Sequence, residues 1–453
     1  MNRDRARGVV VVDATANVEL TAAELRRRVD QVRDALRDAG VVEGQVVLVQ
    51  LPNCWQFVAL EQSLAELGAV IAPIPTVWRR ADVTEAVDST GAAWLVTHAD
   101  HLPQGAIRTV ELSASVHLVK LDAPTGGRGA TDGVGSAADL PHLLAWSVQE
   151  HATRWVAHSR RSADASLARC ADIWGIGPSD TVLVAAAVGF LAGFQWGCRL
   201  AAHLGARQVL VAEWEPLRVT EMIHEHGCTF TYGTRRHLVD LLDVGDGPLG
   251  IRLFALAAAQ PDHELVRAAE ERGCAIVPTL SFPESFLVAT CGPQESIDVR
   301  CTTRGRALPD TTFGTDSRGV LVVDGPQVAP GYLDDLGPGE RRFTAPGRLL
   351  TGDRVELDAA GLVRWSGPVT PVINRSGIAL SPAEIERIVV AHPDVVSASV
   401  SAKPHPRHGD AIAAHLTLRP GADLDVDGLR RFVAARGHAT YKAPDVISVG
   451  SSS

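Results

Sequence analysis

Residues 46 to 73 read VVLVQLPNCWQFVALEQSLAELGAVIAP. The apolar run at residues 46–51 is typical of a buried strand, and a second such run at residues 69–73 ends in proline. Between them, residues 55–67 have the length and the apolar content of a packed helix. A strand, a helix and a strand in this order predict a parallel βαβ unit, and therefore an α/β layered fold.

The same alternation extends in both directions from this unit. Residues 9–12 are suited to a strand, and residues 20–39 predict an amphipathic helix. Thr21 is the expected N-cap of that helix, and Glu24 completes a capping box. Strands and helices alternate again as far as residue 279, interrupted by a stretch rich in Gly, Ala, Thr and Asp at residues 123–139 that we interpret as a loop. In this part of the chain we expect helices at residues 162–174 and 190–204.

The pattern changes in the last third of the chain. Residues 302–365 predict short strands joined by Gly/Pro turns, and hence a β-rich subdomain. A Gly/Pro hinge at residues 367–371 precedes a compact α+β segment. We therefore expect a large N-terminal domain at residues 1–367 and a small C-terminal domain at residues 368–453.

Composition excludes several classes of function. The chain has 453 residues, 46% of them hydrophobic, and a formal net charge of −10, which argues against a nucleic-acid partner. The seven cysteines include no CxxC pair, so we expect no metal site and a reducing compartment. The first seven residues are polar, and the longest apolar stretch, around residues 182–191, is too short to span a bilayer. We expect a cytoplasmic protein with no membrane partner.

Short motifs in the C-terminal half carry a specific resemblance. Residues 325–332 read GPQVAPGY, residues 350–353 read LTGD, and residues 376–386 read SGIALSPAEIE. In this order and spacing they resemble the acyl-adenylate-forming (ANL) superfamily of acyl-CoA ligases, adenylation domains and luciferases. Two weaker strings also resemble this superfamily: LTAAEL at residues 20–25 and LGAVIAPIP at residues 67–75. The resemblance implies the ANL fold: a layered α/β domain with a β-rich subdomain, plus a small α+β C-terminal domain.

The resemblance also implies an acyl-AMP site. Asp353 would hold both ribose hydroxyls, because a carboxylate accepts two O–H bonds at once; a capped turn after Gly352 is the alternative. The adenine-contacting turn falls on Ala258, Ala259 and Gln260, where a simple strand-to-helix turn is an equal interpretation. The remaining members of the expected site are Ser281, Phe282 and Glu284.

CoA would enter through the C-terminal domain. The resemblance places Ser376 and Gly377 along a pantetheine tunnel, where a missing side chain lets the thiol arm pass; an ordinary turn glycine is the alternative. Lys403, with His405, Arg407 and His408, could meet the phosphates of CoA, although a charged surface turn explains the same residues.

The family's acyl pocket falls on four further residues. The alignment places Phe190 and Gly193 at the start of one helix, and Tyr232 and Gly233 at the end of a strand. Aromatic walls suit a bulky hydrophobic acyl group. Ordinary packing against the helix is the competing interpretation.

The ATP-handling parts of the family are missing. Residues 148–154, VQEHATR, stand where a Ser/Thr/Gly-rich loop ending in lysine should cradle the phosphates, and they contain no glycine and no lysine. Pro283 replaces a phosphate-contacting threonine, and Pro368 and Pro371 replace the arginine and the pivot residue of the hinge. Lys442 aligns upstream of the adenylating lysine, so we assign it no role.

All these losses fall on adenylation or on the conformational switch that follows it. We expect an enzyme that transfers the acyl group from acyl-AMP to CoA, needs no Mg-ATP, and depends on a separate adenylating enzyme. This is similar to the non-adenylating acyl-CoA ligases of platensimycin/platencin-type biosynthesis. Three alternatives stay open: a catalytically inactive nucleotide- or partner-binding pseudoenzyme, an ATP-dependent ligase with a disguised loop, and a carrier protein as the thiol acceptor.

Overall fold

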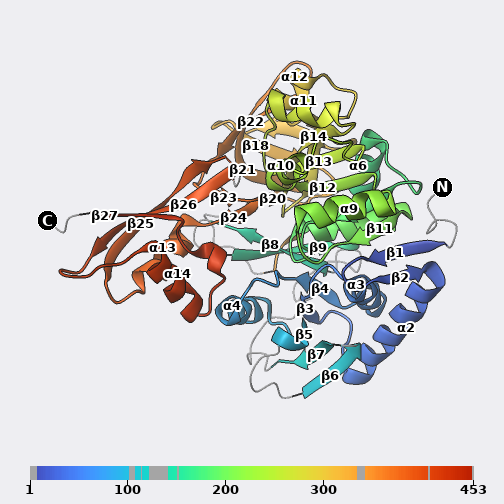
Figure 1. Cartoon of the computed structure of the whole chain (residues 1–453), viewed down its shortest axis with the longest axis horizontal. Coiled ribbons are helices and arrows are strands. Elements are labelled where there is room, and N and C mark those ends of the chain that lie inside the picture. Colours follow the sequence, from blue (N-terminus) through green and yellow to red (C-terminus); the bar gives the residue numbers. More distant parts are fainter. Residues whose placement is uncertain are drawn as a thin grey trace.

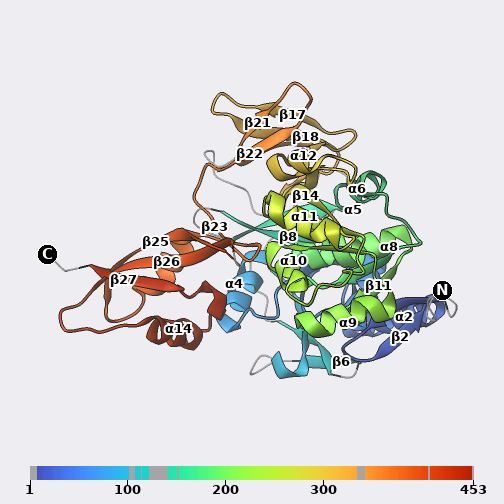
Figure 2. The same cartoon turned by 45° about the horizontal axis from the view of Figure 1, so that its top comes forward.

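The computed structural model describes residues 8–101, 108–113, 115–121, 141–149, 153–333, 342–406 and 409–450. The N-terminal part holds two large sheets with helices packed around them, and a smaller sheet follows (Figure 1). The C-terminal part projects to one side as a separate sheet with its own helices, as Figure 2 also shows. The predicted large layered domain, β-rich subdomain and small α+β unit are all present.

The first sheet contains the βαβ unit predicted from residues 46–73. Its central strand β3 (Val46–Gln50) is parallel to β4 (Val70–Pro73) on one side and to β5 (Trp94–His98) on the other. Helix α3 (Trp55–Leu67) makes the first crossover and ends at Gly68, whose φ of +69° suits a residue without a side chain. The strand order is β19-β9-β8-β4-β3-β5-β7-β6. Its other strands are β6 (Arg108–Ser113), β7 (Val116–Lys120), β8 (Pro141–Val148), β9 (Thr153–Ser159) and β19 (Gly331–Tyr332).

The second sheet has the order β16-β15-β14-β13-β12-β10-β11-β1-β2, and the run from β14 to β1 is parallel. Parallel strands place their carboxyl ends along one edge, where α/β proteins usually bind ligands. Its strands are β1 (Val9–Asp13), β2 (Val18–Thr21), β10 (Thr181–Val184), β11 (Arg207–Leu210), β12 (Phe230–Thr234), β13 (Leu253–Ala257), β14 (Ala275–Phe282), β15 (Phe286–Thr290) and β16 (Arg306–Ala307). The helices packed with this sheet include α9 (Pro216–His226), α10 (Arg235–Leu242), α11 (His263–Glu271) and α12 (Ile297–Thr302).

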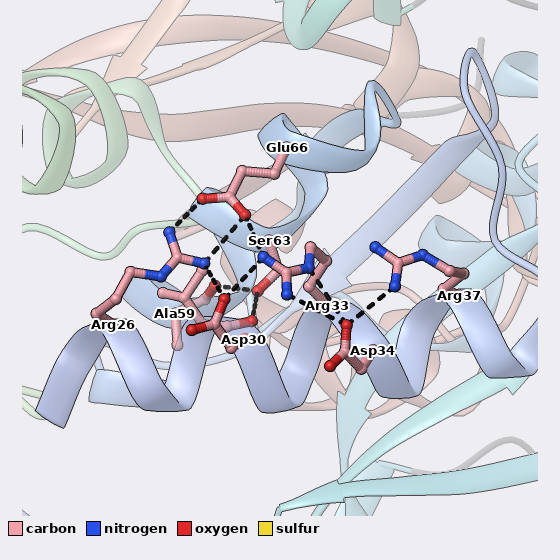
Figure 3. Close-up of polar contacts among 9 residues, drawn as sticks. Arg26, Asp30, Arg33, Asp34, Arg37, Ala59, Ser63 and Glu66 are labelled. Carbon is pink, nitrogen blue, oxygen red and sulfur yellow. Dashed lines mark hydrogen bonds and ion pairs between the residues drawn. The ribbon is translucent and has the colours of Figure 1, made fainter.

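Helix α2 (Ala22–Ala39) begins as the sequence predicts. The Thr21 hydroxyl accepts a hydrogen bond from the Glu24 amide, and the Glu24 carboxylate accepts one from the Thr21 amide. Its buried face packs in the main core, while Arg26 and Arg33 reach across to Glu66 at the end of α3 (Figure 3). These ion pairs are solvated, so the buried apolar face contributes most of the stabilisation.

Two smaller sheets complete the chain. The β-rich subdomain contains β17 (Thr312–Thr315), β18 (Val320–Asp324), β20 (Phe343–Ala345), β21 (Arg348–Leu357) and β22 (Val363–Pro368). The C-terminal sheet contains β23 (Ile373–Arg375), β24 (Ile378–Leu380), β25 (Val395–His405), β26 (Gly409–Leu418) and β27 (Val446–Gly450), with helices α13 (Pro382–Val390), α14 (Val426–Ala435) and the short η4 (Thr440–Lys442). The sheet therefore changes between Pro368 and Ile373. The boundary at residues 367/368 stays a prediction.

Two helices expected from the sequence are interrupted in the structure, and several of its strands were not predicted. The helix expected at residues 162–174 is split into α5 (Arg160–Asp164) and α6 (Leu167–Trp174). The helix expected at residues 190–204 consists of α7 (Leu191–Gly193), a π-helical segment over Phe194–Arg199, and α8 (Leu200–Leu204). Strands β8 and β9 form an antiparallel hairpin that the sequence analysis did not predict.

Some expectations fall outside the described residues. These are the loop at residues 123–139 and the two basic residues Arg407 and His408. Among the described residues, every helix is too short or too polar to cross a lipid bilayer.

Candidate functional site at the domain seam

The C-terminal hairpin β23–β24 meets the carboxyl ends of β12 and β13. The Asn374 side-chain amide donates a hydrogen bond of 2.8 Å to the carbonyl oxygen of Ala258. A Cβ atom added at Gly377 would lie 2.5 Å from Cγ2 of Thr234, the last residue of β12. The predicted adenine turn and the predicted thiol tunnel are therefore neighbours across one seam.

The predicted adenine turn, residues 258–260, is held by its polar groups. Ala258 has a φ of +55°, which is uncommon for a residue with a side chain. The Ala259 carbonyl accepts a hydrogen bond from Arg304. The Gln260 amide group donates to the carbonyls of Arg300 and Thr303, at 2.8 and 3.0 Å. These bonds fix a partly exposed turn whose Ala258 carbonyl faces Asn374 across the seam.

Asp353 lies on β21 and is oriented by an aromatic donor. The indole N–H of Trp365 donates to Asp353 Oδ2 over 2.7 Å. Burial raises the pKa of the Asp353 carboxyl, although the hydrogen bond from Trp365 and the positive charge of Arg342 act in the opposite direction. Arg304 is buried and lies 5.4 Å from the centroid of the Trp365 ring. The sequence motifs name Asp353 as a candidate but not these three neighbours, Trp365, Arg342 and Arg304, which lie outside the motifs.

Glu284 is enclosed by donors from other strands. Its side chain is 1% exposed, and Oε1 accepts hydrogen bonds from the hydroxyl groups of Ser147 (2.7 Å) and Tyr332 (2.8 Å). The Gln149 amide donates a third hydrogen bond to Oε1 over 3.1 Å, and the Arg342 guanidinium lies 3.7 Å from the same oxygen. Ser147 and Gln149 belong to the β8–β9 hairpin, which includes residues 148–154, where the resemblance predicts that a phosphate loop should stand. We call the set Glu284, Ser147, Gln149 and Tyr332 the Glu284 network.

The other predicted members of the acyl-AMP site lie beside Glu284. Ser281, on β14, is exposed, whereas Phe282 is buried in the core between β14 and the β-rich subdomain. Of this pair, only Ser281 is accessible to a ligand.

The predicted acyl-pocket residues divide between two aromatic clusters. Tyr232 is buried, its ring lies 5.5 Å from that of Trp196, and its hydroxyl bonds to Thr279 at 3.1 Å. Phe190 is half-buried and packs on Trp146, with 5.6 Å between ring centroids; Trp146 in turn packs on Trp78. Only the Phe190 cluster has partly exposed rings that could face a ligand.

The two predicted pocket glycines are positions of close approach. A Cβ at Gly193 would lie 2.1 Å from the carbonyl oxygen of Ala186, and one at Gly233 would lie 2.7 Å from Cζ of Phe254. Both glycines are therefore needed for packing of the chain against itself.

The predicted CoA-binding residues gather at one end of the C-terminal sheet. Ser376 and Gly377 form the turn of the β23–β24 hairpin with φ of +55° and +85°, and the Gly377 amide donates to Asn374 Oδ1 over 3.1 Å. Lys403 is exposed near the end of β25. Gly409 pairs with both His405 of β25 and Arg375 of β23, so this strand end and the hairpin share one edge.

This fold and site define a two-domain α/β architecture with its polar site at the domain seam. The family model described as AMP-binding enzyme matches residues 2–142 and 155–333, and the model described as AMP-binding enzyme C-terminal domain matches residues 384–451. The chain therefore belongs to the AMP-binding enzymes of the ANL superfamily, as the motifs predict. The interruption of the match at residues 143–154 coincides with the β8–β9 hairpin.

Relatives of the chain match it along most of its length. The chain is 27% identical over 488 residues to a Streptomyces protein named salicylyl-CoA synthase / salicylate adenylyltransferase, covering 97% of this chain and 87% of the relative. One similar solved structure is a double mutant of o-succinylbenzoate CoA synthetase from Bacillus subtilis, bound with its product analogue. Its TM-score is 0.85 at 20% identity, and the match covers 99% of this chain and 93% of the solved chain. The same enzyme in complex with its acyl-adenylate intermediate has a TM-score of 0.70 at 19% identity, and the match covers 98% of this chain and 92% of the solved chain.

Proposed function

We propose that this protein is an acyl-CoA ligase that catalyses only the second half-reaction of its superfamily. The thiol sulfur of CoA attacks the carbonyl carbon of a preformed acyl-adenylate and forms the thioester bond. The bond between that carbon and the phosphate oxygen breaks, AMP leaves, and the thiol proton passes to solvent. AMP is already a good leaving group, so correct positioning of the two substrates supplies much of the rate.

The observation that carries the proposal is the Glu284 network. A glutamate that held Mg²⁺ beside ATP would need an oxygen directed at open space, because Mg²⁺ demands near-ideal octahedral geometry and keeps several waters. Here the carboxylate is buried, and three side-chain donors converge on Oε1. Freeing that oxygen for a metal would leave the donors of Ser147 and Tyr332 without their partner, which costs more than their net contribution to folding.

The β8–β9 hairpin supports the same conclusion. Val148 pairs with Thr153, so only four residues connect the two strands. A phosphate cradle needs several backbone N–H groups aimed at one point, and usually a lysine. Residues 148–154 contain no lysine and no glycine, and the described side chains Ser147 and Gln149 point at Glu284.

The arrangement of the domains favours thioester formation. Gly377 lies so close to Thr234 that a Cβ there would clash, so the two domains are in contact at the hairpin where CoA would enter. The chain also superposes better on the synthetase bound with its CoA product analogue than on the same synthetase with its acyl-adenylate, with TM-scores of 0.85 and 0.70. The name of the Streptomyces relative includes both adenylyl transfer and CoA thioester formation; the proposal assigns only the second activity to this chain.

The substrates follow from these assignments. The acyl-adenylate would lie between residues 258–260 and Asp353, with its acyl group towards the Phe190 cluster. CoA would enter past Ser376 and Gly377, with Lys403 near its phosphates. A separate adenylating enzyme would supply the acyl-adenylate.

The test is a product assay with two parallel arms. One arm contains a synthetic acyl-AMP with CoA, and the other contains the free acid with ATP, Mg²⁺ and CoA. Thioester from the first arm alone supports the proposal. Thioester from the second arm, or ATP–pyrophosphate exchange, shows that the protein is an ATP-dependent ligase. Repeating the first arm with a pantetheinylated carrier protein in place of CoA decides which of the two is the thiol acceptor.

A further inference from the structure

A buried charge cluster joins the two domains on the side of α4 (Arg80–Thr90). In both views, α4 lies beside the C-terminal domain (Figures 1 and 2). The Lys442 ammonium, on η4 of the C-terminal domain, donates to Asp82 of α4 over 2.8 Å and to Glu384 of α13 over 2.7 Å. Asp82, Glu384 and Lys442 are 3%, 6% and 6% exposed, so all three charges are removed from water.

Neighbouring groups complete the same contact. His438 Nδ1 lies 3.1 Å from Asp82 Oδ1, and the Ala439 amide donates to Asp82 Oδ2 over 2.8 Å. The Ala81 amide donates to the Gly437 carbonyl over 2.8 Å. Asp82 therefore accepts hydrogen bonds from several groups of the C-terminal domain at once.

An aromatic pair extends the contact towards the acyl side of the site. The Trp78 indole donates to the Tyr441 hydroxyl over 2.9 Å, and the Lys442 ammonium lies 5.9 Å from the Trp78 ring centroid. Trp78 also packs on Trp146, which packs on Phe190. The wall of the Phe190 cluster and the C-terminal domain are thus in continuous contact.

The cluster is asymmetric in a way that matters for domain movement. Lys442 and Glu384 both belong to the C-terminal domain and stay paired wherever that domain moves, whereas Asp82 belongs to the large domain. Burial alone would raise the pKa of Asp82, but the bonds from His438 and Lys442 outweigh it and lower the pKa to about 2. Separating the domains removes those partners from Asp82, and removing one partner of a buried pair is strongly destabilising.

We propose that Asp82 and Lys442 are positioning residues that hold the C-terminal domain in the arrangement that forms the thioester. This inference rests on the proposed function. It explains why a chain without adenylation parts retains a lysine in this region: Lys442 fixes the seam and thereby keeps Gly377 beside Thr234. The resting state of the enzyme is then the state that accepts CoA.

The test uses the full chain and the variant Asp82→Asn. Asparagine keeps an oxygen that can accept the hydrogen bond from the amide of Arg79, the N-cap residue of α4. It also leaves the Lys442–Glu384 pair intact. Each domain therefore keeps its own contacts. Hydrogen exchange is followed at the Ala81 and Ala439 amides, whose acceptors lie in the other domain. Asp30→Asn, which removes an exposed ion pair of α2 with Arg26, is the matched control.

We expect exchange at Ala81 and Ala439 to accelerate roughly tenfold in Asp82→Asn, as the loss of a charge-assisted hydrogen bond implies. The KM for CoA should rise by a similar factor, while the affinity for acyl-AMP alone stays within about twofold, because only the C-terminal domain has been released. Tyr441→Phe, which removes the bond to Trp78 without removing a charge, should give a smaller change in the same direction.

Unchanged exchange at both amides in Asp82→Asn would overturn the proposal. Accelerated exchange with an unchanged KM for CoA would overturn the positioning role and leave a purely structural contact. The exchange measurement needs no turnover, so it separates failure of this inference from failure of the proposed function, which would appear as absence of thioester in the unmodified protein.

Discussion

The imidazole of His158 lies flat against the ring of Phe286, with 4.0 Å between the ring centroids and 14° between the planes. Nε2 donates to the carbonyl oxygen of Pro283 over 2.7 Å, and Nδ1 accepts from the Ser162 hydroxyl at 3.2 Å. Because a carbonyl oxygen can only accept, the hydrogen of the neutral ring is on Nε2. His158 therefore holds the backbone next to Glu284 in place.

The first prediction concerns stability at acid pH. Burial lowers the pKa of His158 from 6.5 to about 3, although the bond to Pro283 opposes the shift. Between these values the unfolded chain binds a proton that the folded chain does not, so the free energy of unfolding falls as pH falls. From pH 7 to pH 5 the loss due to this one residue should be about 2 kcal/mol. Denaturant titrations at the two pH values measure it.

The matched pair for this measurement is His158→Gln and Phe286→Leu. His158→Gln removes the titrating group, so the pH dependence of the free energy of unfolding should decrease by the contribution of about one bound proton. Phe286→Leu keeps the imidazole and should lower stability at both pH values without removing that proton. An unchanged pH dependence in His158→Gln would show that the pKa of the ring is the same in the folded and unfolded chains.

A second prediction concerns Asp353 in the proposed reaction. An ionised carboxylate binds the ribose diol best, and burial raises the pKa of Asp353 above its ordinary 3.8. The kcat/KM for acyl-AMP should therefore fall towards acid pH, and the fall should begin above that value. Asp353→Asn should lower kcat/KM about a hundredfold, since hydrogen bonds to a charged group are lost. It should also abolish the fall of kcat/KM at acid pH, which we call the acid limb of the pH profile.

Trp365→Phe gives an independent reading of the same group. Removing the indole donor takes away a hydrogen bond that favours the charged carboxylate, so the acid limb should move to higher pH. A shift in the opposite direction would contradict the assignment of Asp353 as the group that controls the limb.

The fold was predictable wherever local signals sufficed. The apolar runs at residues 46–51 and 69–73 and the Thr21 capping box depend on neighbouring residues, and the structure confirms them. The helix at residues 162–174 was predicted as continuous, because its break at residues 165–166 contains neither Gly nor Pro. The β8–β9 hairpin was missed because β8 is buried along most of its length and lacks the alternation that marks a half-buried strand.

The sequence indicates positions for the candidate site, and these stay predictions, whereas the contacts of those residues could not be predicted at all. Glu284 was found from its motif, yet its partner Ser147 lies 137 residues away, and the bond depends on how β8 and β14 are placed. Lys442 was given no role because it aligns upstream of the family's adenylating lysine, and its partner Asp82 lies 360 residues away in the chain. The sequence carries no signal for such distant pairs.

A third prediction compares two glutamates of different burial. Glu284→Ala should lower the free energy of unfolding by about 3 kcal/mol or more, because buried donors lose their acceptor. Glu66→Ala is the control: Glu66 binds Arg26 and Arg33 with 37% of its side chain exposed, and the loss should stay below about 1 kcal/mol. Chemical denaturation of both variants measures the difference, and equal losses would contradict the Glu284 network.

The last prediction tests the seam at Gly377. Gly377→Ala introduces a Cβ 2.5 Å from Thr234 Cγ2 at a φ of +85°. Gly421 has a φ of +80° in the same domain with no atom near its missing Cβ, so Gly421→Ala carries the backbone strain alone, about 1 kcal/mol. The kcat/KM for CoA should fall at least tenfold in Gly377→Ala and stay near that of the unmodified protein in Gly421→Ala. Adding Thr234→Ser to Gly377→Ala removes the clashing methyl group but keeps the hydroxyl, so the double variant should recover part of the lost activity. Without that recovery, strain in the hairpin rather than contact with Thr234 would be the cause.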